Sequence, residues 1–116
     1  MLLKETKIRE VSVISSRQKQ SILDFLQGCI YCWCNNNPNQ WFSLRDLMGN
    51  HNYDWHDTPL IFLYEKHRYK LHKSNEISIQ AAGKDAGWLL KKVIHEDKRK
   101  FDTKKENLIR QYKWIK

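Results

Sequence analysis

Residues 98–115 read KRKFDTKKENLIRQYKWI, and in this segment aromatic and β-branched side chains lie on both sides of a polar run at 104–107. Such side chains favour strands, and a polar run between two of them favours a turn. We therefore expect a β-hairpin in which Phe101, Tyr112 and Trp114 share one face against a core, because side chains alternate along a strand. The other face then carries three lysines to solvent: Lys100, Lys104 and Lys113.

The first half of the chain favours two helices separated by a polar loop. Apolar residues recur at helical spacing after the serine pair 15–16, whose hydroxyls can accept hydrogen bonds from the free amides of a first turn. After the loop, residues 41–42 predict a short extended segment, and Ser43 with Asp46 resembles a capping box for a second, short helix. Alternating valines at 9–14 predict a short edge strand before the first helix.

Two further helices are predicted between this short helix and the hairpin. Thr58-Pro59 provides a cap followed by a proline, which is well tolerated in the first turn of a helix. The charged stretch 68–76 is typical of a surface loop. A fourth helical region is predicted over 77–98, where Gly83 and Gly87 can bend or break the helix.

Length and composition predict one domain over residues 1–116. The 116 residues, of which 41% are hydrophobic and 12% aromatic, suffice for a single core. We expect an α+β, mainly helical fold: three to four helices followed by a C-terminal β-hairpin. No stretch is typical of a signal peptide or membrane span, and the odd cluster Cys29, Cys32 and Cys34 suits a reducing compartment, so a cytoplasmic location is expected.

The basic residues are concentrated at the C-terminal end. The net charge is +8, and residues 84–116 hold eleven Lys/Arg against five Asp/Glu, whereas residues 1–83 hold ten against eight. On a helix, the basic residues from Lys84 onwards lie opposite the apolar ones, and such a face attracts phosphate polyanions. The residues that we expect to contact nucleic acid are Lys84, Trp88, Lys91, Lys92, His95, Lys98, Arg99, Lys100, Lys104, Lys105, Arg110 and Lys113.

The order of helices and basic hairpin over residues 42–115 resembles that of winged helix-turn-helix DNA-binding domains. Within it, residues 82–88, AGKDAGW, are similar to a helix-turn-helix corner, where small residues let two helices meet closely. Gly83 and Trp88 depart from that pattern, and one continuous helix is the alternative. The resemblance implies that one helix enters the major groove and that the hairpin, the wing, contacts the flanking backbone.

We therefore expect a DNA-binding accessory or regulatory protein, with nucleic acid as its partner and without catalytic residues, cofactor or metal. Duplex DNA is the expected target, although RNA and the oligomeric state stay open. The main alternative is a protein-interaction adaptor on the same scaffold, in which Trp41, Tyr53 and Trp55 dock onto an acidic protein partner. No membrane partner is expected.

Two metal-dependent alternatives rest on polar clusters. The loop 50–57 concentrates imidazoles and carboxylates, which a metal-dependent nuclease can use to hold a cation and activate water. Thiols at 29–34, together with His51 and His56, are potential zinc ligands. Their spacing lacks the second paired motif of a structural zinc site, so buried thiols are the preferred interpretation.

Overall fold

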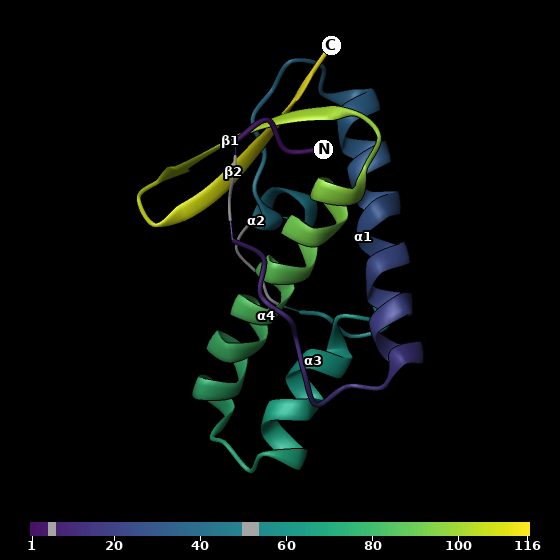
Figure 1. The fold of residues 1–116 in the computed structure, drawn as a ribbon. Coiled ribbons are helices and arrows are strands. Elements are labelled where there is room, and N and C mark those ends of the chain that lie inside the picture. The colour runs from purple at the N-terminus through teal and green to yellow at the C-terminus, as the bar shows by residue number, and fades with distance from the viewer. Residues whose placement is uncertain (5–6, 50–53) are drawn as a thin grey trace.

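Within residues 1–4, 7–49 and 54–116, which the computed structural model describes, four helices precede a C-terminal hairpin. The elements are α1 (Ser16–Asn36), α2 (Leu44–Leu47), α3 (Ile61–Glu65), the π-helical turn η1 (Lys66–Lys70), α4 (Asn75–Glu96), β1 (Lys100–Glu106) and β2 (Ile109–Ile115). The predicted α+β, mainly helical class is confirmed. Figure 1 shows α1 and α4 side by side, α3 and η1 against the first half of α4, and the hairpin projecting near its other end. No helix of this described part is long and apolar enough to cross a membrane.

The serine caps predicted for the first two helices are present. Ser15 Oγ accepts a hydrogen bond from the amide of Gln18 at 3.0 Å, and the side chain of Gln18 accepts one from the Ser15 amide at 3.1 Å. Ser43 and Asp46 form the same reciprocal pair at the start of α2, at 3.4 and 2.7 Å. These bonds satisfy amides that have no partner inside the helix, so each helix begins where its serine stands.

The helix-turn-helix corner expected at 82–88 is wrong, because α4 continues through Gly83 and Gly87 without a break. Contacts with α1, α2 and α3 compensate for the low helix propensity of glycine. The chain instead turns at residues 71–74, between η1 and α4. There Ser74 caps α4 by accepting a hydrogen bond from the amide of Ile77 at 3.3 Å.

Three other expectations are corrected. Residues 9–14 form no strand, and the N-terminal pairing is a parallel bridge between Leu2 and Phe101. Thr58 caps no helix, because its hydroxyl donates to the carbonyl of Trp55 at 2.9 Å. The expected loop at 68–76 shrinks to four residues, since η1 reaches Lys70 and α4 begins at Asn75.

The predicted hairpin is confirmed, but its turn is formed by Asn107 and Leu108 and not by residues 104–107, because β1 stays paired with β2 through Glu106. Phe101 lies opposite Trp114 and Thr103 opposite Tyr112, so these side chains share one face, as the alternation predicts. Phe42 forms an antiparallel bridge with Tyr112, in which each amide donates to the other's carbonyl at 2.8 Å. The extended segment predicted at 41–42 thus joins the hairpin edge.

The core lies where this hairpin face meets α1 and α4. Phe42, Phe101 and Tyr112 are buried, and the ring centroids of Phe42 and Phe101 stand 6.4 Å apart in an edge-to-face arrangement. Side chains of α1 and α4, including Ile22, Leu26, Ile30, Ala86, Leu89, Leu90 and Ile94, complete the cluster. Docking of the hairpin therefore depends on the same apolar cluster that joins the two long helices.

A buried polar network joins η1 to α4. Asp85 Oδ2 accepts hydrogen bonds from Lys66 Nζ and His67 Nε2, both at 2.7 Å. On the other side of the imidazole, His67 Nδ1 accepts from Lys73 Nζ at 2.8 Å. Lys66 and His67 are both buried, so Asp85 is the group that compensates the desolvated lysine.

We predict that Asp85→Ala destabilises the fold by about 3 to 5 kcal/mol, because it leaves the buried Lys66 ammonium without its carboxylate. Urea denaturation followed by circular dichroism measures the loss. The double variant Lys66→Met with Asp85→Leu should recover most of it, since it removes both charges. A loss below about 1 kcal/mol for Asp85→Ala would show that the network contributes little.

Candidate nucleic-acid interface

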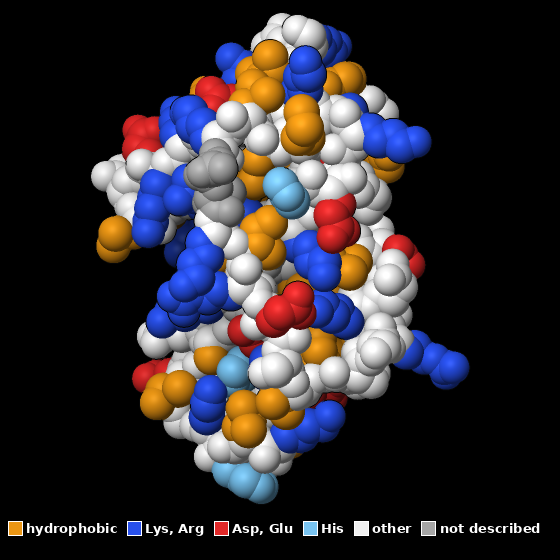
Figure 2. All heavy atoms as spheres, in the orientation of Figure 1, with side chains coloured by type: hydrophobic (Ala, Val, Ile, Leu, Met, Phe, Trp, Pro, Cys, Tyr) orange, Lys and Arg blue, Asp and Glu red, His pale blue; other side chains and the backbone are white. Residues whose placement is uncertain are grey.

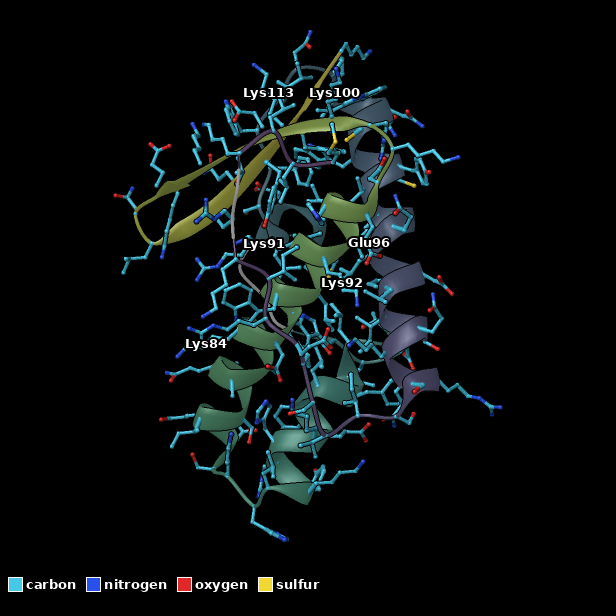
Figure 3. All side chains as sticks on the ribbon, in the orientation of Figure 1. Lys84, Lys91, Lys92, Glu96, Lys100 and Lys113 are labelled. Atoms are coloured by element: carbon cyan, nitrogen blue, oxygen red, sulfur yellow. The ribbon has the colours of Figure 1, made fainter. Side chains whose placement is uncertain are left out.

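The basic residues predicted to share one face of α4 point to two different sides. Figure 3 shows Lys84 and Lys91 on the side of α4 that lies below the hairpin, and Lys92 and Glu96 on the side that faces α1. The charge of Lys92 contributes to lowering the pKa of Glu10, after the hydrogen bond and charge of Lys19. Lys92 therefore faces an acidic neighbour and lies apart from Lys84 and Lys91.

The N-terminal segment lies between these two sides. The guanidinium of Arg9 stands 5.3 Å from the ring centroid of Trp88, and the Lys91 ammonium 5.0 Å from it. Trp88 is half-buried and packs against the core. Two cations of its own chain thus occupy the Trp88 ring, which favours the packing role over stacking on a base.

The Arg99 side chain contacts both α1 and the two strands of the hairpin. Its guanidinium donates two hydrogen bonds to the Asp97 carboxylate, at 2.9 and 3.1 Å. It also lies within 5.2 Å of the ring centroids of Tyr31, Phe101 and Trp114. Both the charge and the face of the Arg99 guanidinium are thus engaged by groups of its own chain.

Asp97 is almost fully buried beside this arginine, with 3% of its side chain exposed. Burial by itself would raise the pKa of Asp97, but hydrogen bonds from Arg99 and Gln27 outweigh burial and lower the pKa from 3.8 to about 2. The ionised carboxylate is thus favoured in the folded state.

From this shift we predict that stability falls as the pH drops from about 4 to 2. The folded pKa lies below the unfolded value, so the contribution, about 2 kcal/mol, is present above pH 4 and is lost as the pH falls through the folded pKa. Urea denaturation over this range measures it. In Asp97→Asn this part of the pH dependence should disappear, and an unchanged slope would contradict the assignment.

The outer face of the hairpin carries cations interleaved with acidic groups. Lys104 forms an ion pair with Glu106 at 3.2 Å, and its ammonium stands 4.5 Å from the ring centroid of Trp41. Asp102 pairs with Lys4 at 2.9 Å. Lys100 and Lys113 lie at the far end of the hairpin from its tip (Figure 3). Among the remaining predicted residues, His95 and Lys98 are exposed near the end of α4.

The inner face of the hairpin brings cations together without acidic partners. Lys105 and Arg110 are cross-strand neighbours on the face that also carries Phe101 and Tyr112, and this face meets α4. Burial, and then the charges of Arg110 and Lys105, lower the pKa of Lys91 below its usual 10.5. Lys84, Lys91, Lys105 and Arg110, which we call the notch cluster, form no ion pair with any carboxylate of the described residues.

In Figure 2 the Lys and Arg side chains gather where the projecting hairpin meets the body of the molecule, and a notch separates the two. A groove of about 260 Å³ lies beside them, between α2, α4 and the hairpin tip. Gly83 and Gly87 line it on α4, and Leu108 and Arg110 line it on the hairpin. Of the notch cluster, Arg110 lines this groove, and Gly83 and Gly87 add no side chain to its wall on α4.

Packing does not require these glycines. A Cβ built at Gly83 or at Gly87 meets no atom within 4 Å outside the local helix. Glycine in a helix interior costs about 0.5 to 1 kcal/mol relative to alanine. The two positions therefore reduce the stability of α4 and keep the groove beside it open.

We predict that Gly83→Ala and Gly87→Ala each raise the free energy of unfolding by about 0.5 to 1 kcal/mol, because alanine is the better helix former and its methyl group fits. Thermal and urea denaturation measure the gain. Gly49→Ala is the matched control: its φ is +84°, so that variant should lose stability. Destabilisation by either helix variant would contradict the open groove.

The structure describes only some of the residues of the rival hypotheses. Trp55 is only 5% exposed, Trp41 lies against Lys104 and Lys113, and Tyr53 lies outside the described residues. His51 also lies outside the described residues, so the structure does not describe the complete set of potential zinc ligands. The described residues include no group of three potential metal ligands. Burial raises the pKa of the Cys29 and Cys34 thiols.

Sequence reasoning missed Arg9, the two groove glycines and Leu108. Arg9 lies in the stretch 9–14 that predicts a strand, the glycines lie in the expected corner, and Leu108 directly follows the predicted turn. A leucine directly after an asparagine, in the place of the usual turn glycine, is the signal that marks Leu108. Comparison with protein-family models, curated proteins and solved structures found no match to this chain.

Proposed function

We propose that this protein binds duplex DNA as an accessory or regulatory factor, and that the notch cluster makes the central phosphate contacts. The observation that carries the proposal is the convergence of Lys91, Lys105 and Arg110 without a carboxylate partner among the described residues. Like charges at close range repel, and the lowered pKa of Lys91 reports burial and that repulsion. An anion bound between these cations offsets their mutual repulsion, so the site favours an anionic ligand.

Phosphate is the anion that best fits this arrangement. The Arg110 guanidinium can donate two parallel hydrogen bonds to one phosphate, while Lys91 and Lys105 act as point charges towards it or its neighbours. Each phosphate neutralised on a duplex releases condensed counterions, which provides affinity independent of sequence. Lys84 lies two turns before Lys91 and extends the contact along α4.

The order of elements supports a duplex as the target. A short bridge at Phe42, the pair α3 and α4 and a C-terminal hairpin follow each other as in a winged helix, in which a helix enters the major groove. In this arrangement Gln80 and Lys84, both exposed, precede the notch on α4. The notch cluster adds to this architectural analogy a specific site for phosphate.

We place the protein in the cytoplasm. Cys29, Cys32 and Cys34 are all free thiols, and one of them is exposed, which suits a reducing compartment.

We predict that affinity for a short duplex falls with salt, with a slope of log affinity against log salt between about −3 and −4 for four phosphate contacts. Lys105→Gln and Arg110→Gln should each reduce that slope by about 1 and weaken all sequences alike. Fluorescence anisotropy between about 50 and 200 mM salt measures both effects.

Lys92→Gln and Lys98→Gln are the matched controls, because they remove the same charge outside the notch cluster. Their affinities should stay within about twofold of the unmodified protein. Equal losses for control and notch variants would show diffuse attraction to net charge, and absence of duplex binding would contradict the proposal.

A further inference from the structure

The hairpin ends in an exposed leucine held in an unfavourable backbone conformation. Leu108 is 89% exposed, more than any other large apolar side chain of the described residues. Its φ is +64°, and that of Asn107 before it is +51°. Both turn residues thus lie in the left-handed region that glycine and asparagine tolerate best.

No packing among the described residues accounts for leucine at this position. A two-residue hairpin turn with both φ angles positive favours Asn-Gly, and Asn107 meets the first preference while Leu108 departs from the second. The side chain of Leu108 gains little burial in return. Leucine here costs folding stability without filling the core, which points to a contact outside the molecule.

The surroundings of Leu108 select a polyanion as that contact. Lys105 and Arg110, cross-strand neighbours close to the tip, belong to the notch cluster, and Arg110 lines the same groove as Leu108. At the tip, Glu106 is paired with Lys104. An apolar tip bordered by cations that form no ion pair with the described residues has the charge complementarity that a nucleic-acid duplex requires.

We propose that Leu108 is a wedge that enters the minor groove of duplex DNA and inserts at a base-pair step, while Lys105 and Arg110 hold the phosphates beside it. The inference rests on the proposed DNA binding and adds the mode of contact. Inserted apolar side chains partly unstack a step and bend the duplex by about 20 to 90° towards the major groove. Flexible pyrimidine–purine steps such as TA are therefore the preferred sites of insertion.

Leu108→Gly separates folding from binding. Glycine relieves the positive φ, so the melting temperature should stay the same or rise. Loss of the wedge should weaken duplex binding by about tenfold and abolish the bend, measured by energy transfer between dyes on the two ends of a duplex with a central TA step. Asn107→Gly is the matched control, since it relaxes the neighbouring residue, keeps Leu108, and should retain both affinity and bend.

The outcomes distinguish the two proposals. If the unmodified protein binds the duplex with the expected salt dependence, but Leu108→Gly binds and bends it equally well, the wedge is refuted and DNA binding stands. Binding of the unmodified protein without bending refutes the wedge in the same way. Absence of duplex binding refutes both proposals, and a lower melting temperature for Leu108→Gly refutes the claim that leucine is costly at this turn.

Discussion

Docking of the hairpin through Phe101 and Tyr112 is the constraint on which the rest of the structure depends. Side chains alternate along a strand, so a hairpin that buries these two residues must direct Lys105 and Arg110 to the same side, towards α4. The bridge between Phe42 and Tyr112 ties β2 to the segment before α2 and so holds the hairpin in this orientation. The apolar core thus forces together charges that repel each other, and the notch cluster follows from the packing.

Several features around the notch oppose folding. The like charges near Lys91 raise its electrostatic energy, Gly83 and Gly87 weaken α4, and Leu108 adopts a conformation suited to glycine. Gly83, Gly87 and Leu108 line one groove between α4 and the hairpin tip, and Arg110, one of the cations near Lys91, lines it too. Residues that reduce the stability of the fold tend to cluster at functional sites, and the shared position of these residues supports one binding surface.

The sequence predicts most of the regular structure, because its signals are local. Capping serines, helical periodicity and the strand alternation of the hairpin each act over a few residues and gave the correct element, whereas the alternation at 9–14 did not. Contacts between segments far apart in the chain are what these local signals do not predict: α4 continues through its glycines because it packs against other helices, and Asp85 binds Lys66 of η1. The charge excess of the C-terminal third predicts a basic surface, but only the fold shows that Arg99 is held by Asp97.

The most direct test of this account is the pKa of the Lys91 ammonium, measured by NMR titration of the free protein and of its complex with a short duplex. The account predicts a value below 10.5 in the free protein, since burial and the neighbouring cations disfavour the charge. On binding, phosphate at the notch should raise that value above the free one. A pKa that is unchanged or lower in the complex would show that no phosphate reaches Lys91, and the notch cluster would not be the binding site.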